Sequence, residues 1–137
     1  MTRICHLLIV AVFAALPLLA DSATDAGNVV TKLATDLSGN NPAGFLKPID
    51  HEMPGYAKLR EQVEALLGRA EVSSSISILE NEGDDARRTL SLDWYMEIRS
   101  RGTGDKTEPR RRAVRCVLAK SGKAWRVVEL DPAGLFE

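Results

Sequence analysis

The sequence predicts an α+β domain in which N-terminal helices pack on one curved antiparallel sheet. Apolar residues recur at three- and four-residue spacing between 29 and 67, and they alternate with polar residues between 71 and 130. The first spacing places apolar side chains on one face of a helix, and the second places them on one face of a strand. Short polar segments that contain glycine separate the alternating stretches, as turns between antiparallel strands do. With 137 residues, the chain is expected to form a single domain with one hydrophobic core.

Residues 1–22 have the pattern of a secretory signal peptide. Arg3 gives a positive start, an uncharged and largely apolar stretch follows as far as Ala20, and small residues come next. Cleavage after Ala20 or after Ser22 fits this pattern. The alternative is an uncleaved membrane anchor, but the apolar stretch is shorter than the ~20 residues that a spanning helix needs. We therefore expect export to the periplasm or the extracellular space, a mature domain over 23–137, and no membrane association once the leader is removed.

Two long helices and a short helical segment are expected before the sheet. The first helix should begin at Thr24 or Asp25, whose side-chain oxygens can accept from the free N–H groups of the first turn. Its apolar stripe comprises Val29, Val30, Leu33 and Leu37. A Gly-Asn-Asn-Pro segment at 39–42 ends it, a short helical segment over 43–49 brings apolar side chains onto the core, and the second long helix covers 55–67.

Four strands are expected over 71–79, 87–101, 110–120 and 124–130. Their shared apolar face comprises Leu90, Leu92, Trp94, Met96, Ile98, Val114, Cys116, Leu118, Val128 and Leu130. Pairing Glu97 with Arg115, and Arg115 with Glu129, keeps this face intact and places an acid–base–acid row on the other side. A slip by one residue would turn the apolar side chains out to water, so the charge pattern and the apolar pattern favour the same register.

The last expected strand follows a turn and reads Gly-Lys-Ala-Trp-Arg-Val-Val-Glu-Leu from Gly122 to Leu130, and the strand before it contains Val-Arg-Cys-Val-Leu from Val114. Together with the order of helices and strands, these motifs resemble the NTF2-like (SnoaL-like, cystatin-like) superfamily over residues 25–136. The resemblance implies a cone in which the curved sheet wraps around a cavity that the helices close. Members include isomerases, dehydratases, polyketide cyclases, transport factors and many non-catalytic modules, so the resemblance implies no single function.

The apolar face of the expected sheet forms the inside of this cone. We expect a ligand pocket there, lined by Leu92, Trp94, Met96, Cys116, Leu118 and Val128. The outer face of the sheet is expected to carry Asp93, Tyr95, Glu97, Arg115, Trp125 and Val127. Exposed apolar residues such as Trp125 and Val127 often mark an interface, so we expect this face to bind a second copy of the chain or another protein.

Candidates for catalysis are few, because the expected inner face is almost wholly apolar. In the enzymes that the chain resembles, an Asp or His from the cone interior acts as a base. The remaining candidates here are Asp50, His51 and Glu52, in a loop at the cone mouth, where the histidine could act as a general base. More often such a triplet is an exposed polar loop.

The sequence predicts no metal site and no cofactor. Outside the leader, His51 and Cys116 are the only histidine and cysteine, too few for a metal site and for an internal disulfide. No phosphate-binding Gly-rich loop or nucleophile motif is present, and a net charge of -1 argues against nucleic-acid binding. We therefore expect an exported, non-catalytic domain that binds a small apolar ligand or a protein partner. The alternative is an enzyme of the isomerase, dehydratase or cyclase kind that uses the residues at the cone mouth.

Overall fold

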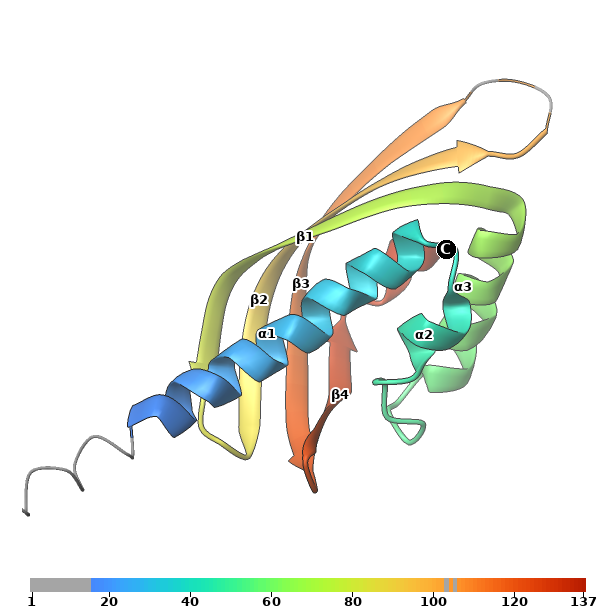
Figure 1. Ribbon diagram of the computed structural model, residues 1–137. Helices are drawn as coiled ribbons and strands as arrows, with labels where there is room; N and C mark the ends of the chain where they lie inside the picture. Colours follow the sequence, from blue (N-terminus) through green and yellow to red (C-terminus); the bar gives the residue numbers. More distant parts are fainter. Residues whose placement is uncertain (1–15, 103, 105) are drawn as a thin grey trace, which may run out of the picture.

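The computed structural model of the chain describes residues 16–102, 104 and 106–137. Helices precede strands along the chain, as Figure 1 shows. The elements are α1 (Leu16–Ser38), α2 (Pro42–Leu46), α3 (Tyr56–Arg69), β1 (Ala70–Gly83), β2 (Arg87–Ser100), β3 (Thr107–Ser121), β4 (Ala124–Asp131) and a 3-10 helix, η1 (Gly134–Phe136). The strands form one antiparallel sheet in the order β1-β2-β3-β4. The sheet is curved and the helices pack on one side of it, so the α+β prediction is confirmed.

Helix α1 runs across the sheet and packs mainly against β1 (Figure 1). It begins at Leu16, so Thr24 and Asp25 lie within the helix, and the predicted N-cap at these residues is wrong. Residues 1–15 of the predicted signal peptide lie outside the described part of the chain, and the peptide stays a prediction. No helix in the described part is long and apolar enough to cross a membrane.

The helices bury most of the apolar residues whose spacing predicted them. The buried ones are Val30, Leu33, Leu37, Leu59, Val63, Leu66 and Leu67, whereas Val29 of the predicted stripe is half-buried. Helix α1 ends at Ser38, and Asn40 then adopts a left-handed conformation with φ 53°, which asparagine tolerates better than most residues. Asn41 caps α2, because its side-chain oxygen accepts a hydrogen bond from the N–H of Gly44 at 3.0 Å.

Strands β2 and β3 pair in a register that differs from the predicted one. Glu97 lies opposite Pro109 rather than Arg115, and Arg115 lies opposite Ser91. The shift is by an even number of residues, so the side chains of both strands keep their predicted faces. An opposed charge pair contributes only about 0.2–1 kcal/mol. Such a pair is too weak to fix a register that the connecting turn sets.

Strand β4 contains a β-bulge that the sequence did not reveal. Val117 of β3 lies opposite Glu129, but the next residue, Leu118, lies opposite Val127. Val128 is therefore an additional residue in β4. An extra residue in a strand reverses the faces of all the residues on one side of it, because successive side chains point to opposite faces.

This reversal overturns three of the predicted positions. Trp125 is 5% exposed and Val127 is 0% exposed, and both belong to the hydrophobic core. Their predicted place on the outer face is therefore wrong. Val128, which was predicted inside the ligand pocket, is only half-buried.

Both edges of the sheet are partly covered. On β1, the hydroxyl of Ser38 donates to the backbone oxygen of Ser74 at 3.2 Å and accepts from its backbone nitrogen at 2.9 Å. On β4, the backbone nitrogen of Val127 donates to the oxygen of Pro48, and its oxygen accepts from the nitrogen of Asp50, each at 2.9 Å. These contacts satisfy backbone groups that an edge strand otherwise leaves unpaired. They also hold the segment after α2 beside β4.

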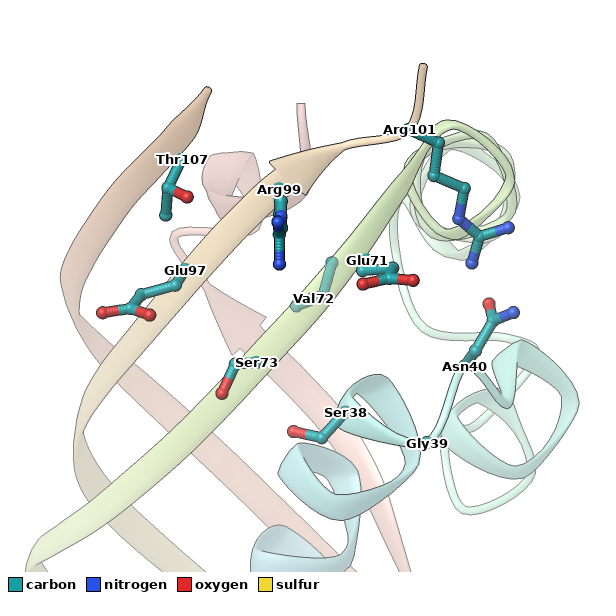
Figure 2. Close-up of a pocket in the computed structure, with 10 residues that line it drawn as sticks. All are labelled: Ser38, Gly39, Asn40, Glu71, Val72, Ser73, Glu97, Arg99, Arg101 and Thr107. Carbon is teal, nitrogen blue, oxygen red and sulfur yellow. The ribbon is translucent and has the colours of Figure 1, made fainter. Parts of the chain in front are cut away.

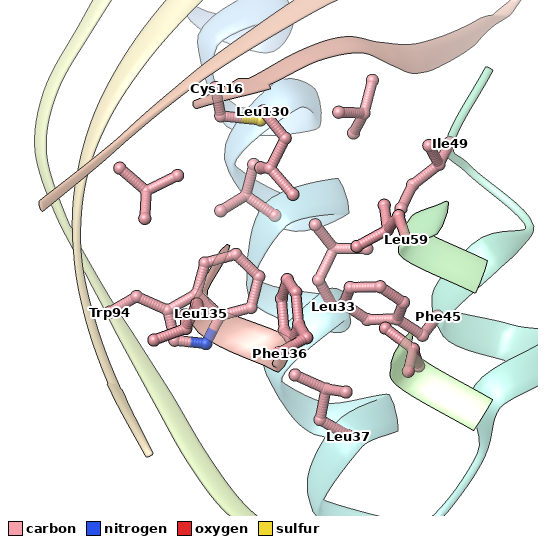
Figure 3. Close-up of a cluster of buried hydrophobic side chains, with 14 of the residues drawn as sticks. Leu33, Leu37, Phe45, Ile49, Leu59, Trp94, Cys116, Leu130, Leu135 and Phe136 are labelled. Atoms are coloured by element: carbon pink, nitrogen blue, oxygen red, sulfur yellow. The ribbon is translucent and has the colours of Figure 1, made fainter. Parts of the chain in front are cut away.

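An aromatic cluster fills the space between the sheet and the helices. The ring of Phe136, in η1, lies between those of Trp94 and Phe45, as Figure 3 shows. Its centroid is 5.5 Å from that of Trp94 and 5.4 Å from that of Phe45, with an edge-to-face arrangement in both pairs. None of the three residues is more than 1% exposed. The C-terminal 3-10 helix therefore completes the core of the domain.

Candidate functional site

The interior that was expected to hold a ligand is part of the packed core. The residues that face inwards as predicted are Leu92, Trp94, Met96, Cys116 and Leu118, and none is more than 1% exposed. They belong to one buried cluster with Phe45 and Phe136 (Figure 3). Side chains of the sheet, the helices and the C-terminus thus occupy the centre of the cone.

The loop after α2 holds Asp50, His51 and Glu52 at the surface. The carboxylate of Asp50 accepts a hydrogen bond from the backbone N–H of Glu52 at 2.9 Å, a contact that stabilises the turn. The ring of His51 stacks on that of Tyr56, with centroids 4.7 Å apart. His51 and Glu52 are exposed, and Asp50 is half-buried. These contacts hold Asp50 and His51 in a surface turn.

The outer face of β2 carries charged and polar side chains, as predicted. Two nitrogens of the Arg111 guanidinium donate to the carboxylate of Asp93, at 3.0 and 2.9 Å. These hydrogen bonds hold the pKa of Asp93 below its ordinary value. The hydroxyl of Tyr95 donates to Glu97 at 2.9 Å, and this hydrogen bond raises the pKa of Tyr95. Asp93, Tyr95 and Glu97 therefore form hydrogen bonds with neighbouring side chains at the surface.

The outer face of β3 continues this pattern of charge pairs. Arg115 lies opposite Asp131 in the register, yet its Nη1 is 2.8 Å from Oε1 of Glu129. The predicted pair of Arg115 and Glu129 thus forms diagonally. Trp125 and Val127, the apolar residues that motivated the prediction of a dimer or partner face, are buried on the other side of the sheet. The outer face therefore lacks the exposed tryptophan and valine on which the prediction of a dimer or partner face rested.

A polar groove of about 580 Å³ lies where the end of α1 meets β1 and β2, as Figure 2 shows. Its lining residues are Ser38, Gly39, Asn40, Glu71, Val72, Ser73, Glu97, Arg99, Arg101 and Thr107. Asn40 and Arg101 point towards each other, and the amide oxygen of Asn40, when it faces the guanidinium, lies 3.2 Å from it. The two acidic and two basic side chains balance in charge. The sequence did not reveal this groove, because the end of α1 meets the strands only in the fold.

A second cavity, of about 320 Å³, lies between α1, the segment around α2 and the start of β4. Its lining residues are Val29, Lys32, Gly44, Lys47, Pro48, Ala124, Trp125 and Arg126, and we name it the Trp125 pocket. The lining combines an indole, a valine and a proline with two lysines and one arginine. Apolar walls with a few polar groups are typical of small-molecule sites, and the volume lies at the lower end of their usual range of about 300–1,000 Å³.

The indole N–H of Trp125 is an unusual group beside this pocket. It is buried, and it has no hydrogen-bond partner among the described residues. The chain's other tryptophan, Trp94, donates to the hydroxyl of Ser74 at 2.8 Å. Buried polar groups are nearly always paired, and leaving one without a partner costs about 1–3 kcal/mol. The nitrogen has almost no accessible surface, so its lack of a partner is a feature of the packing beside the pocket.

No three His, Cys, Asp or Glu side chains in the described part of the chain are arranged to hold a metal ion. Cys116 is fully buried, and this burial, with a smaller contribution from the charge of Glu129, raises the pKa of its thiol to about 12. The thiol stays protonated at neutral pH, so it is a poor nucleophile and a poor metal ligand.

Solved structures with the same arrangement of helices and strands come from several bacteria. A conserved protein from Planctomyces limnophilus matches with a TM-score of 0.72 and 11% identity, over 81% of this chain and 93% of that one. An NTF2-like superfamily protein from Salmonella enterica serovar Typhimurium matches with a TM-score of 0.65 and 13% identity, over 81% and 89%. A provisionally assigned dehydratase of the NTF2-like family from Streptomyces avermitilis matches with a TM-score of 0.64 and 6% identity, over 81% and 94%.

No protein-family model matches the chain, and no curated protein matches it significantly. The likeness to solved structures lies in the fold, because the sequence identities are low. It agrees with the resemblance that the final two strands indicated. The protein therefore has the NTF2-like, or cystatin-like, fold.

Proposed function

We propose that the protein is an exported, non-catalytic domain that binds a small apolar ligand in the Trp125 pocket. The observation that carries this proposal is a cavity of about 320 Å³ whose wall combines Val29, Pro48 and the buried ring of Trp125 with cationic side chains. A ligand in the pocket would cover the apolar side chains that line it. The fold alone does not select a function, so the proposal depends on this site.

The Trp125 pocket is a better ligand site than the centre of the cone. Trp94, Phe45 and Phe136 occupy that centre, with ring centroids 5.4 to 6.4 Å apart. A ligand at the centre would have to displace large side chains that are already buried and packed. A ligand in the Trp125 pocket would occupy space that the fold leaves open.

The alternative, an enzyme that uses the cone mouth, finds less support in the geometry. A general base must lie within hydrogen-bond reach of a bound substrate. Asp50 instead accepts from a backbone N–H, and His51 stacks on Tyr56 at the surface. A homodimer through the outer face of the sheet is also less favoured, because Trp125 and Val127 are buried.

The neutral probe N-phenyl-1-naphthylamine, which fluoresces more strongly in apolar sites, tests the pocket. We expect saturable enhancement with the purified protein. In the Ala124→Leu variant, which fills the pocket, affinity should fall about ten-fold, a loss of about 1.4 kcal/mol. Ala113→Leu is the matched control, because Ala113 is an equally exposed strand alanine that lines a different cavity. Undiminished binding by Ala124→Leu, or no saturable binding at all, would contradict the proposal.

Export requires a separate test, because it rests on residues 1–22 of the sequence. Expression of the full chain in a Gram-negative host should yield a periplasmic protein whose intact mass corresponds to a start at Asp21 or Ala23. A Leu8→Glu variant should remain in the cytoplasmic fraction at full length, because a charge in the apolar segment disrupts a signal peptide. Full-length parent protein in the cytoplasmic fraction would contradict export.

A further inference from the structure

We propose that the ligand of the Trp125 pocket carries an anionic group, and that Lys47 and Arg126 hold this group. The inference rests on the function proposed above, because it concerns the same pocket. It defines the ligand class as small organic anions with an apolar body, such as aryl or alkyl carboxylates.

Positive charge converges on the pocket from three parts of the chain. Lys32 comes from α1, Lys47 from the segment after α2, and Arg126 from β4. Lys32 forms an ion pair with Asp36 at 2.6 Å. The ion pairs found among the described residues involve neither Lys47 nor Arg126. The pocket therefore has an excess of positive charge in a protein whose net charge is -1, and such a local excess attracts anions.

The cations that line the pocket require a partner that accepts hydrogen bonds. A carboxylate oxygen only accepts hydrogen bonds, whereas an ammonium group only donates them. A carboxylate can therefore pair with Lys47 and Arg126 through its two oxygens. The planar guanidinium of an arginine is particularly well suited to a carboxylate, because it can donate two parallel hydrogen bonds.

The apolar part of the pocket restricts the ligand further. Val29, Pro48 and the ring of Trp125 line it, and an inorganic anion alone would leave these surfaces without contact. A cavity of about 320 Å³ accommodates a ring or a short alkyl chain with one charged group. An amphipathic organic anion matches the apolar walls and the cations together.

Three displacers with one naphthalene body and different charges test this inference. At pH 7, 1-naphthylacetate is an anion, 2-(1-naphthyl)ethanol is neutral and 2-(1-naphthyl)ethylamine is a cation. Each is titrated into the purified protein with bound N-phenyl-1-naphthylamine. The carboxylate should displace the probe at an about ten-fold lower concentration than the alcohol, and the amine should be the weakest displacer. Higher salt should narrow the difference between the displacing concentrations of the carboxylate and the alcohol, because salt screens exposed charges.

The double variant Lys47→Gln/Arg126→Gln identifies the residues that recognise the anion. It should lose most of the preference for the carboxylate over the alcohol. The control variant Lys58→Gln/Arg60→Gln removes two exposed charges of the same kinds from α3 and should keep that preference.

The possible outcomes separate the inference from the function on which it rests. Equal displacement by the carboxylate and the alcohol, or a preference for the amine, would overturn the anionic ligand and leave the apolar pocket in place. A carboxylate preference that survives in the Lys47→Gln/Arg126→Gln variant would overturn the role of these two residues. Failure of the parent protein to bind the neutral probe would instead overturn the proposed function.

Discussion

Ser74 of β1 accepts a hydrogen bond from the indole N–H of Trp94 in β2, with 2.8 Å between the two atoms. The backbone of Ser74 also exchanges hydrogen bonds with the hydroxyl of Ser38 at the end of α1. One small residue on an edge strand thus joins the first helix to the fully buried indole at the centre of the core. The contrast with Trp125 is direct, because its N–H finds no such acceptor among the described residues.

Replacement of Ser74 by alanine should destabilise the protein by about 1–3 kcal/mol, because it leaves the N–H of Trp94 buried and unpaired. The free energy of unfolding in urea measures this loss. Ser75→Ala is the matched control, since Ser75 is exposed on the opposite face of β1 and should have little effect. In a Trp94→Phe background, which lacks the donor, Ser74→Ala should lower the free energy of unfolding by less. Equal losses in the two backgrounds would show that the hydrogen bond does not stabilise the fold.

Replacement of Phe136 by alanine should destabilise the protein by about 3–5 kcal/mol, the usual cost of removing a buried aromatic ring. Phe136 lies between Trp94 and Phe45, so its loss opens an apolar cavity at the centre of the cone. Thermal or urea unfolding measures the effect, and benzene should restore part of the stability of the variant by filling the cavity. Glu137→Ala is the control, because Glu137 is exposed and should matter little. A loss below about 1 kcal/mol for Phe136→Ala would contradict the role of η1 in the core.

The faces of β2 could be predicted from the sequence, but those of β4 could not. In β2, apolar residues alternate with charged or polar ones, so only one face can be buried. In β4, Trp125 and Val127 form one alternating set and Val128 and Leu130 form the other, and both sets are apolar. The bulge at Val128 lets members of both sets face the core. Nothing local to β4 identifies that extra residue.

The candidate site was missed for a related reason. The Trp125 pocket forms where the segment around Lys47 packs beside β4, and the contact runs through backbone hydrogen bonds between Val127 and its neighbours Pro48 and Asp50. Backbone contacts between distant segments leave no pattern in the side chains. Trp125 and Arg126 belong to a motif that is recognisable in the sequence. Strand alternation, however, predicted Trp125 on the outer face of the sheet. The sequence therefore contains the residues that line the pocket, but it does not show that the fold brings them together.

The carboxyl group of Asp93 should titrate below its ordinary pKa in the folded protein. Hydrogen bonds from Arg111 are the main cause, so Arg111→Gln should raise the pKa of Asp93 towards its ordinary value. A depressed pKa stabilises the fold above the unfolded-state pKa, and this contribution is lost as the pH falls through the folded-state pKa. Carboxyl chemical shifts in an NMR titration measure the change. Arg112→Gln is the control, because Arg112 donates to a backbone oxygen instead, and an equal shift in that variant would contradict a specific pair.

The thiol of Cys116 should make the stability of the protein decrease at high pH. Its pKa is raised from 9.0 to about 12, chiefly by burial. As the pH rises above 9, the unfolded chain loses this proton first, so the free energy of unfolding falls by about 1.4 kcal/mol for each pH unit until the folded thiol also titrates. Urea unfolding at several values between pH 8 and 11 measures the slope. Other groups titrate in this range, so the comparison with Cys116→Ala isolates the thiol.

Between pH 8 and 11, the stability difference between the parent protein and Cys116→Ala should shrink by roughly 2–3 kcal/mol. Cys5 is replaced by serine in every protein compared, so that Cys116 is the remaining thiol. Val117→Ala serves as the control, because it removes buried apolar volume from the same strand without removing a titratable group. Its stability should follow the pH dependence of the parent protein. Parallel curves for the parent protein and Cys116→Ala would mean that the thiol titrates as an exposed cysteine does, which would contradict the packed core around it.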